Sequence, residues 1–425
     1  MVLGVVLSIK NLHLMNYLIE HPSKIVKGKV SLPASKSLSN RALIIQAICK
    51  EAFSISNLSQ AKDTKVLKEA LENFSNTINT DDAGTSMRFL TAFFSIQKQE
   101  VVLKGSKRMH ERPIAPLVEA LNSLGANISY LQKDGYPPLH IKKGNIQGGD
   151  IQVNSTISSQ FISALLLIAP TLSGGLTIKL KGNLVSKSYL EMTLKMMAYF
   201  GIEYKWSSQT IQIKEQQYKA KDISIENDWS AVTFWLEIVA IAEQAQIELN
   251  GLCKNSWQGD IKALSIFSKL GVNYRFDNNQ LILFKELKKK PAKQLNLIKT
   301  PDLAQAICCT YACLKHRLKI IGLSTLKIKE TDRISAIQSE LKKLGVDTKI
   351  TQNSILIKDF CEYVGTPLIK TNQDHRMAMS FAPLSLRFGK LIIEDVDVVK
   401  KSYPTFWEEL EKVGFTIFPV TDSNN

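Results

Sequence analysis

The chain of 425 residues has no apolar run long enough to cross a membrane, and it lacks the signatures of several common enzyme classes. Its N-terminal stretch has neither a basic start nor a small-residue cleavage site, so we expect no signal peptide. The absence of GxxxxGK[ST], GxGxxG, HExxH and GxSxG patterns argues against ATP, NAD, zinc-protease and serine-hydrolase sites. Because no low-complexity linker is present either, any hinge between domains must be short, and residues 225–228 are the candidate.

Cysteine and charge narrow the class of protein further. The 54 lysines and arginines outnumber the 39 acidic residues, and the formal net charge of +15 suits an anionic partner. These cations are scattered apart from a short run at 288–290, so a small anionic metabolite is favoured over a nucleic acid or a membrane. No cysteine pair has CxxC spacing, which favours reduced, buried thiols in a cytoplasmic protein and no metal site. The six cysteines are Cys49, Cys253, Cys308, Cys309, Cys313 and Cys361.

A helical stretch that ends at a glycine and is followed by a strand-like run recurs along the chain. The glycines are 69 to 76 residues apart: Gly125, Gly201, Gly271, Gly345 and Gly414. Each is expected to end a helix in the left-handed backbone conformation, which glycine adopts without strain. With a weaker first copy at 71–76, the period predicts six α/β modules arranged in two domains. The alternative is an α/β protein whose helices end alike by chance.

Helix after helix begins with residues suited to binding anions. Lys36 and Arg41 lie among three serines ahead of an apolar run, and backbone N–H groups at a helix N-terminus are free to bind an anion. Comparable starts lie at 81–88, 108–113, 158–160, 186–189, 300–302, 327–333, 372–377 and 400–404. Any one of them is explained as a cap or a surface salt bridge, but together they predict helix N-termini of two domains facing one cleft. The candidate acid–base groups within them are Lys36, Asp302, Lys329, Glu330 and His375.

Several of these stretches together resemble the EPSP synthase family of enolpyruvyl transferases. The resemblance rests on residues 36–43, 83–88, 108–114, 158–161, 329–333 and 374–379, in that order, and it extends over nearly the whole chain after about residue 24. It implies an α/β fold of two domains, each made of three βαβαββ units, with helix N-termini pointing into the interdomain cleft. It also implies one domain at 35–226, a second that joins 15–34 to 227–425, and an extension at 1–14.

The resemblance implies a reaction and a set of site residues. The family moves the enolpyruvyl group of phosphoenolpyruvate to the 5-hydroxyl of shikimate 3-phosphate and releases phosphate, without a metal or organic cofactor, in aromatic amino acid biosynthesis. The residues implied for shikimate 3-phosphate are Lys36, Ser37, Arg41, Ser158, Ser159, Gln160, Ser186, Tyr189, Asp302 and Lys329. Those implied for phosphoenolpyruvate are Lys36, Gly84, Arg112, Arg333, Arg376 and Lys401.

The same resemblance assigns proton transfers to two side chains and the placing of the reacting hydroxyl to a third. Asp302 is expected to accept the proton of the 5-hydroxyl, and Lys329 to place that hydroxyl. Glu330 is expected to handle the proton that is added to, and later removed from, the methylene carbon. Lys36 and His375 complete the catalytic set.

A few positions depart from the pattern of the family. Asp82 and Thr325 stand where the family commonly has asparagine, Ser188 replaces a common proline, and Phe89 follows Arg88 where a proline is usual. Gly84 is kept, as in family members that are open to the inhibitor glyphosate. The resemblance therefore predicts a glyphosate-sensitive enzyme and leaves the roles of Asp82 and Thr325 open.

Two other functions remain as alternatives. The sister enolpyruvyl transferase that acts on UDP-N-acetylglucosamine carries a loop cysteine and a Lys-Asn pair, whereas Lys36 is followed here by Ser37. A non-catalytic repeat protein that binds phosphate or RNA is the other, because the net charge allows it. The favoured prediction is a cytoplasmic, monomeric enzyme with small anionic substrates and no nucleic-acid or membrane partner.

Overall fold

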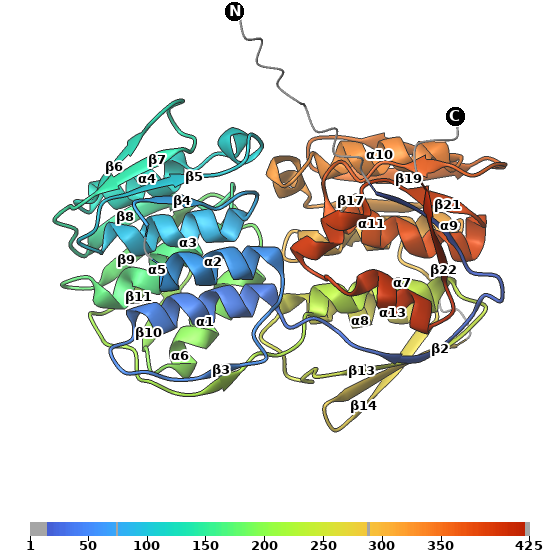
Figure 1. The fold of residues 1–425 in the computed structure, drawn as a ribbon, viewed down its shortest axis with the longest axis horizontal. Coiled ribbons are helices and arrows are strands. Elements are labelled where there is room, and N and C mark those ends of the chain that lie inside the picture. Colours follow the sequence, from blue (N-terminus) through green and yellow to red (C-terminus); the bar gives the residue numbers. More distant parts are fainter. Residues whose placement is uncertain (1–14, 74, 287–289, 421–425) are drawn as a thin grey trace, which may run out of the picture.

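The computed structural model describes residues 15–73, 75–286 and 290–420, which form two bodies side by side (Figure 1). One hydrophobic core is built from residues 34–225, and the other from residues 19–32 together with 229–415. The second body therefore combines the start of the described chain with its second half. The expected extension at 1–14 lies outside the described residues, as does most of the lysine run at 288–290.

The first body carries the helices and strands between residues 36 and 224. Its helices are α1 (Lys36–Ile48), α2 (Lys62–Glu72), α3 (Gly84–Ser95), α4 (Ala115–Ser123), α5 (Ser159–Ile168) and α6 (Lys187–Tyr199), with 3-10 helices η1 (Met109–Glu111) and η2 (Ala169–Thr171). Its strands are β3 (Ile55–Ser56), β4 (Thr77–Asn79), β5 (Val101–Lys104), β6 (Asn127–Tyr130), β7 (Leu139–Lys142), β8 (Gly149–Asn154), β9 (Leu176–Lys181), β10 (Tyr204–Ser207), β11 (Thr210–Ile213) and β12 (Ile223–Ser224).

The second body carries the remaining elements. Its helices are α7 (Trp229–Ile241), α8 (Ala263–Phe267), α9 (Ala304–Cys313), α10 (Arg333–Lys343), α11 (His375–Phe381), α12 (Ser385–Phe388) and α13 (Phe406–Lys412). Its 3-10 helices are η3 (Gly259–Lys262), η4 (Ser268–Leu270), η5 (Pro301–Leu303), η6 (Ser324–Ile328), η7 (Ala382–Leu384) and η8 (Val396–Lys401). Its strands are β1 (Asn16–Glu20), β2 (Ile25–Val30), β13 (Gln244–Asn250), β14 (Val272–Asp277), β15 (Gln280–Lys285), β16 (Gln294–Asn296), β17 (Leu318–Ile321), β18 (Val346–Ile350), β19 (Ser354–Phe360), β20 (Leu368–Ile369), β21 (Leu391–Ile393) and β22 (Thr416–Val420).

Within the described residues, five of the six sheets share one four-stranded pattern. The first strand pairs in parallel with the second, and two antiparallel strands follow, as in the order β4-β5-β7-β6. A parallel pair needs a crossover, which a helix such as α3 supplies, so the pattern is the expected βαβαββ unit. The sixth sheet pairs only β3 with β12, and β3 lies between α1 and α2 along the chain. The first module, whose repeat at 71–76 was less clear in the sequence, therefore has its helices α1 and α2 but a sheet of two strands instead of four.

The helices form the inside of each body because several of them are apolar on all sides. Every residue of α7 and of α9 is buried, which is the pattern of a helix enclosed by other elements. The strands instead alternate buried and exposed residues, as β8 and β9 do, so each sheet has one face towards solvent. This arrangement leaves the ends of the helices, rather than their sides, to meet the other body.

Two short chain segments connect the bodies and lie against each other. The Ser35 N–H donates to the Glu226 carbonyl at 2.9 Å, and the Asp228 N–H donates to the Pro33 carbonyl at 2.8 Å. An antiparallel bridge between residues 34 and 227 lies between these two bonds. The starts of α1 and α7 are therefore fixed close together, at the position where a short connection was expected.

The repeated glycines adopt the backbone conformation that the sequence predicted. Gly125, Gly201, Gly271, Gly345 and Gly414 have φ angles of 97°, 85°, 84°, 72° and 101°. They follow α4, α6, η4, α10 and α13 respectively, and each precedes a strand. The prediction of repeated helix ends is confirmed.

The described part of the chain includes no helix long and apolar enough to cross a membrane. All six cysteines are free. Cys308, Cys309 and Cys313 are buried on α9 as expected, whereas Cys253 and Cys361 are exposed, so the expectation of buried thiols was wrong for those two. Both lie in loops, where no apolar element covers them.

Candidate active site

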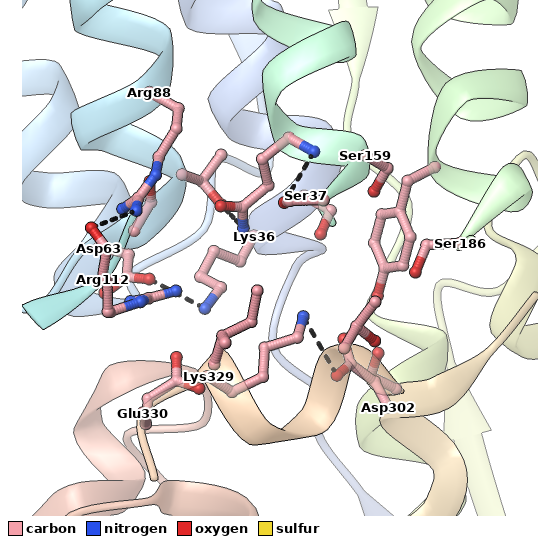
Figure 2. A pocket seen from close by; sticks show the side chains of 18 of the residues that line it. Lys36, Ser37, Asp63, Arg88, Arg112, Ser159, Ser186, Asp302, Lys329 and Glu330 are labelled. Atoms are coloured by element: carbon pink, nitrogen blue, oxygen red, sulfur yellow. Dashed lines mark hydrogen bonds and ion pairs between the residues drawn. The ribbon is translucent and has the colours of Figure 1, made fainter. Parts of the chain in front are cut away.

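A cavity between the two bodies is lined by the first turns of helices from both. In the first body these are the starts of α1, α2, α3, α5 and α6, and in the second the starts of α7, α10 and α11. Figure 2 shows side chains of the two bodies facing each other across this cavity. Of the site residues expected from the sequence, those that line it are Lys36, Ser37, Arg41, Gly84, Arg112, Ser158, Ser159, Gln160, Ser186, Tyr189, Asp302, Lys329, Glu330, Arg333, His375 and Arg376.

The start of α1 has the cap that its sequence predicted. Ser35 accepts a hydrogen bond from the Leu38 N–H through its side chain, at 3.4 Å. Lys36 then points into the cavity, and its Nζ lies 3.0 Å from Oδ2 of Asp63 on α2. The ammonium group of Lys36 is thereby held beside the cavity with one carboxylate as its partner.

Arg41 is held deep beneath the α1 start. Its Nε donates to Thr193 Oγ1 at 2.7 Å, its Nη1 to the Ser37 carbonyl at 2.8 Å, and its Nη2 to Ser163 and the Tyr189 carbonyl at 3.3 Å each. Burial lowers the pKa of Arg41 to about 10, so the guanidinium remains charged at neutral pH. Arg41 therefore fixes α1 to α5 and α6, with its positive charge below the cavity.

Two arginines meet at the start of α3. Arg112 lies flat against Gly84, where an added Cβ would be 2.5 Å from its Nη2. Arg88 on α3 supports it by donating to the Arg112 and Pro113 carbonyls at 3.4 and 2.8 Å. Within the described residues, the Nε atoms of both arginines are buried without a hydrogen-bond partner. Burial and the charge of Arg112 hold the pKa of Arg88 well below its usual value. Two guanidinium groups this close together leave positive charge that an anion can offset.

Asp82, whose role the sequence left open, has a local structural role. Its carboxylate accepts a hydrogen bond from Ser106 Oγ. Its backbone carbonyl accepts from Arg112 Nη1 at 3.4 Å and from Lys401 Nζ at 2.9 Å. The carbonyl thus joins Arg112 of the first body to Lys401 of the second, and Lys401 reaches the site without lining the cavity itself.

Asp302 receives donors from both bodies. Its Oδ1 accepts from Arg333 Nη1 at 2.7 Å, and its Oδ2 accepts from the Tyr189 hydroxyl at 2.8 Å. Lys329 Nζ and Arg376 Nη2 each lie 3.6 Å from the carboxylate. Burial opposes ionisation, but the charges of Lys329, Arg376 and Arg333 outweigh it and hold the pKa of Asp302 well below its usual value.

Arg333 joins three carboxylates at the start of α10. Besides Asp302, it donates from Nε to Asp374 at 2.6 Å and from Nη2 to Glu330 at 2.9 Å. The second oxygen of Glu330 lies 3.6 Å from Lys401 Nζ. Burial alone would raise the pKa of Glu330, but Arg333 and Lys401 hold it well below its usual value. Glu330 is therefore ionised at neutral pH.

Lys329 and His375 are two further cavity groups whose pKa values are lowered. Burial lowers the pKa of Lys329, and Asp302 offsets only part of this effect. Burial and the charge of Lys36 hold the pKa of His375 well below its usual value, so its imidazole is neutral at pH 7. The His375 Nδ1 is buried without a hydrogen-bond partner among the described residues.

The serines of α5 and α6 differ in what they do. Ser158 caps α5 by accepting from the Gln160 N–H at 3.3 Å, and Gln160 in turn donates to Thr85 Oγ1 at 3.2 Å. Ser186 was expected to supply a similar polar helix start, but it makes no side-chain cap and adopts a left-handed φ of 53°. Its N–H donates instead to the Ile298 carbonyl of the other body at 2.7 Å.

Sequence reasoning did not assign several residues that line the cavity. Thr85, Arg88 and Thr325 were seen in motifs or departures without a role, while Asp63 and Ser230 were not singled out. Thr325 is buried, and its Oγ1 has no partner among the described residues. The described part of the chain contains no group of three or more histidine, cysteine or acidic side chains arranged to hold a metal ion.

Comparisons with known proteins agree on one family. The family model described as EPSP synthase (3-phosphoshikimate 1-carboxyvinyltransferase) matches residues 20–83 and 72–410. A protein named 3-phosphoshikimate 1-carboxyvinyltransferase from Bacteroides fragilis (strain YCH46) is 43% identical over 406 residues, covering 95% of this chain and 99% of that protein. One of the same name from Histophilus somni (strain 2336) is 34% identical over 426 residues, covering 92% and 98%.

The fold matches as well. A solved structure of EPSP synthase from Acinetobacter baumannii superposes with a TM-score of 0.76, covering 96% of this chain and all of that one, at 23% identity. At that identity the likeness concerns the fold, and it is the two-domain enolpyruvyl-transferase fold that the sequence led us to expect.

Proposed function

The chain belongs to the EPSP synthase family, and from that premise we propose that it transfers the enolpyruvyl group of phosphoenolpyruvate to the 5-hydroxyl of shikimate 3-phosphate. The products are 5-enolpyruvylshikimate 3-phosphate and phosphate, on the route to the aromatic amino acids. The observation that carries the proposal is the cavity, where buried cations and two ionised carboxylates meet at opposing helix N-termini. Both proposed substrates are polyanions, as such a site requires.

Shikimate 3-phosphate is proposed to bind on the side of α1, α5 and α6. The hydroxyls there and the backbone N–H groups of the α5 start are suited to a phosphate and a polyol. Tyr189 joins this side to Asp302 through its hydroxyl. The residues proposed for this substrate are Lys36, Ser37, Arg41, Ser158, Ser159, Gln160, Ser186, Tyr189, Asp302 and Lys329.

Phosphoenolpyruvate is proposed to bind between Arg112 and the start of α10. Arg112 is the best supported ligand, because part of its guanidinium is unused and Arg88 lies behind it. Arg333 is also expected here, although its donors are already held by three carboxylates. The residues proposed for this substrate are Lys36, Gly84, Arg112, Arg333, Arg376 and Lys401.

The proposed chemistry needs two proton transfers. The 5-hydroxyl attacks C2 of phosphoenolpyruvate as C3 gains a proton, and the tetrahedral intermediate then expels phosphate as C3 loses one. We propose that Asp302 takes the hydroxyl proton with Lys329 beside it, and that Glu330 gives and removes the proton at C3. The cations stabilise the negative charge of the intermediate, and no redox change or cofactor is involved.

The low pKa values that the protein's own charges give Asp302 and Glu330 have a consequence for this mechanism. A carboxylate whose pKa lies far below the usual value is a weak base, and very little of it is protonated and able to act as an acid. Bound phosphates and the carboxylate of phosphoenolpyruvate offset the charges of Arg333, Lys329 and Lys401, so they raise the pKa of Asp302 and Glu330. Proton transfer is therefore expected to become effective only when both substrates are present.

Phosphate release tests the proposal against both alternatives. The protein mixed with phosphoenolpyruvate and shikimate 3-phosphate is expected to liberate phosphate, and Arg376→Ala is expected to weaken the use of phosphoenolpyruvate sharply. Release with UDP-N-acetylglucosamine instead would identify the sister reaction, and binding without release would identify a non-catalytic protein. The described residues that line the cavity include no cysteine, which disfavours the sister enzyme.

We further propose that the two bodies are domains spanning 35–226 and 15–34 with 227–425, since each has its own core. A monomeric, cytoplasmic enzyme without nucleic-acid or membrane partners remains our prediction. Chain mass in solution and fractionation of cells test these two properties separately.

A further inference from the structure

Arg108 belongs to the first body, yet it donates hydrogen bonds to the backbone of the second body beside the cavity. Its Nε donates to the Glu330 carbonyl at 3.0 Å, and its Nη2 donates to the Lys329 carbonyl at 3.0 Å. Its Nη1 is paired with Glu111 at 3.0 Å. Among the described residues Arg108 is not part of the cavity lining, so its contacts are to the chain that carries the proposed acid–base groups and not to the cavity itself.

The loop that carries Arg108 is held firmly on its own side. A Cβ at Gly105 would lie 2.7 Å from the Asp81 carbonyl, so only glycine lets the loop approach the turn between β4 and α3 this closely. Ser106 Oγ accepts from the Met109 N–H at 3.2 Å, and Arg88 donates to the Met109 sulfur at 3.1 Å. The loop that carries both Arg108 and Arg112 is therefore held in place, and Arg108 extends from it to the second body.

On the other side, Lys329 and Glu330 lie between η6 and α10, outside any helix. Their side chains diverge, since Lys329 reaches Asp302 (Figure 2), whereas Glu330 reaches Arg333 and Lys401. Holding two consecutive carbonyls fixes the peptide planes before and after Glu330, because each peptide unit is rigid. The direction in which the Glu330 side chain leaves the backbone is then set, and one of the two peptide planes that flank Lys329 is fixed as well.

We propose that Arg108 is a positioning residue, which fixes these two peptide planes and so aims Glu330 into the cavity, and constrains Lys329, when the two bodies meet. Arginine suits this task because its planar group presents several donors in fixed directions, whereas lysine offers a single point charge. The catalytic consequence rests on the proposed function; the contact between Arg108 and residues 329–330 does not.

The kinetic test compares Arg108→Ala and Arg108→Lys with two controls. Lys107→Ala removes the same charge from an exposed neighbour, and Glu111→Gln removes the ion pair while keeping the arginine. We expect both Arg108 variants to lower kcat about 10- to 100-fold, the range for losing a hydrogen bond to a charged group. KM for either substrate should change much less than kcat, because Arg108 does not line the cavity. Both controls should keep wild-type kinetics.

Hydrogen–deuterium exchange separates this inference from the proposed function. Peptides that cover 326–334 should exchange faster in substrate-free Arg108→Ala than in wild type or Lys107→Ala, with thermal unfolding checking that each variant is folded. If Arg108→Ala does not fold, Arg108→Lys takes its place in both measurements. Unchanged exchange, or wild-type kcat in Arg108→Lys, would overturn the inference. If exchange at 326–334 is faster in Arg108→Ala but the wild type releases no phosphate, the contact made by Arg108 is supported and the proposed function is rejected.

Discussion

Replacing Gly84 by alanine tests how closely the site is built around Arg112. Gly84 is the first residue of α3, where its backbone suits any amino acid, so the only direct effect is the added methyl group. That carbon would lie 2.5 and 2.6 Å from the two terminal nitrogens of Arg112 and 2.8 Å from Cζ. Ordinary contact begins near 3.4 Å, so the guanidinium must move away by about 0.9 Å.

The magnitude follows from what this guanidinium is proposed to bind. A displacement of about 1 Å in a positioned group can cost about 100-fold in rate, and a hydrogen bond to a charged group contributes about 1.5–3 kcal/mol. We therefore expect KM for phosphoenolpyruvate to rise about 10- to 100-fold in Gly84→Ala, equivalent to about 1.4–2.8 kcal/mol. Stability should not fall, because alanine is favoured over glycine in a helix by up to about 1 kcal/mol.

The assay is initial phosphate release against phosphoenolpyruvate concentration, at saturating shikimate 3-phosphate. Gly259→Ala is the matched control, because its added carbon would meet Ser188 Cβ at 2.2 Å on the opposite side of the site. That variant is expected to affect shikimate 3-phosphate rather than phosphoenolpyruvate. An unchanged KM for phosphoenolpyruvate in Gly84→Ala, or equal changes in both variants, would refute the reasoning.

Three further predictions concern other parts of the site. Ser188→Ala removes the 2.6 Å hydrogen bond that Ser188 Oγ donates to the Lys299 carbonyl of the other body. We therefore expect KM for shikimate 3-phosphate to rise about fivefold, equivalent to about 1 kcal/mol. Steady-state kinetics at saturating phosphoenolpyruvate measure this KM, and a wild-type value would contradict the prediction. Burial and Asp302 raise the pKa of Asp260 from 3.8 to about 6, so its protonated form stabilises the fold below pH 3.8, and this contribution, about 3 kcal/mol at most, is lost as the pH rises through 6. Urea unfolding of wild type and Asp260→Asn between pH 3.8 and 7 should therefore differ in pH dependence, and parallel curves would reject the assignment. Glyphosate should inhibit phosphate release because Gly84 leaves the site open, and full activity at high glyphosate would disprove that sensitivity.

Features that depend on a few neighbouring residues could be predicted from the sequence. Gly125 and Gly414 end helices with positive φ because only glycine does so without strain, and that requirement is visible in the sequence itself. Ser35, Ser158 and Asp374 cap the helices that follow them, since a short polar side chain reaches the free N–H groups of the next turn. These local signals, repeated at a regular spacing, were enough to indicate the modules and their polar ends.

Features that depend on distant contacts could not be predicted in this way. Asp63 lies in a Lys-Asp-Thr-Lys stretch typical of a solvated helix start, but it is 4% exposed because Lys36 covers it. Arg108 and Arg112 belong to one motif and look equivalent in sequence. Arg108 donates hydrogen bonds to the backbone of the second body, whereas Arg112 lies against Gly84 beside the cavity. The partner of Arg108 is decided by packing between segments more than 200 residues apart, and that of Arg112 by packing against the start of α3.

The way the second body is closed also has a consequence for how the protein is made. Strand β1 lies between β21 and β22, so residues 17–19 pair with residues 391–393. A ribosome adding about 5–20 residues per second would leave β1 without those partners for roughly 20 to 75 s, while the sheets of the first body need only residues up to 224. The first body can therefore fold as an insert during synthesis, whereas the second can be completed only after residues 391–393 have been made. A circular permutant that begins at residue 227 would reverse this order of completion.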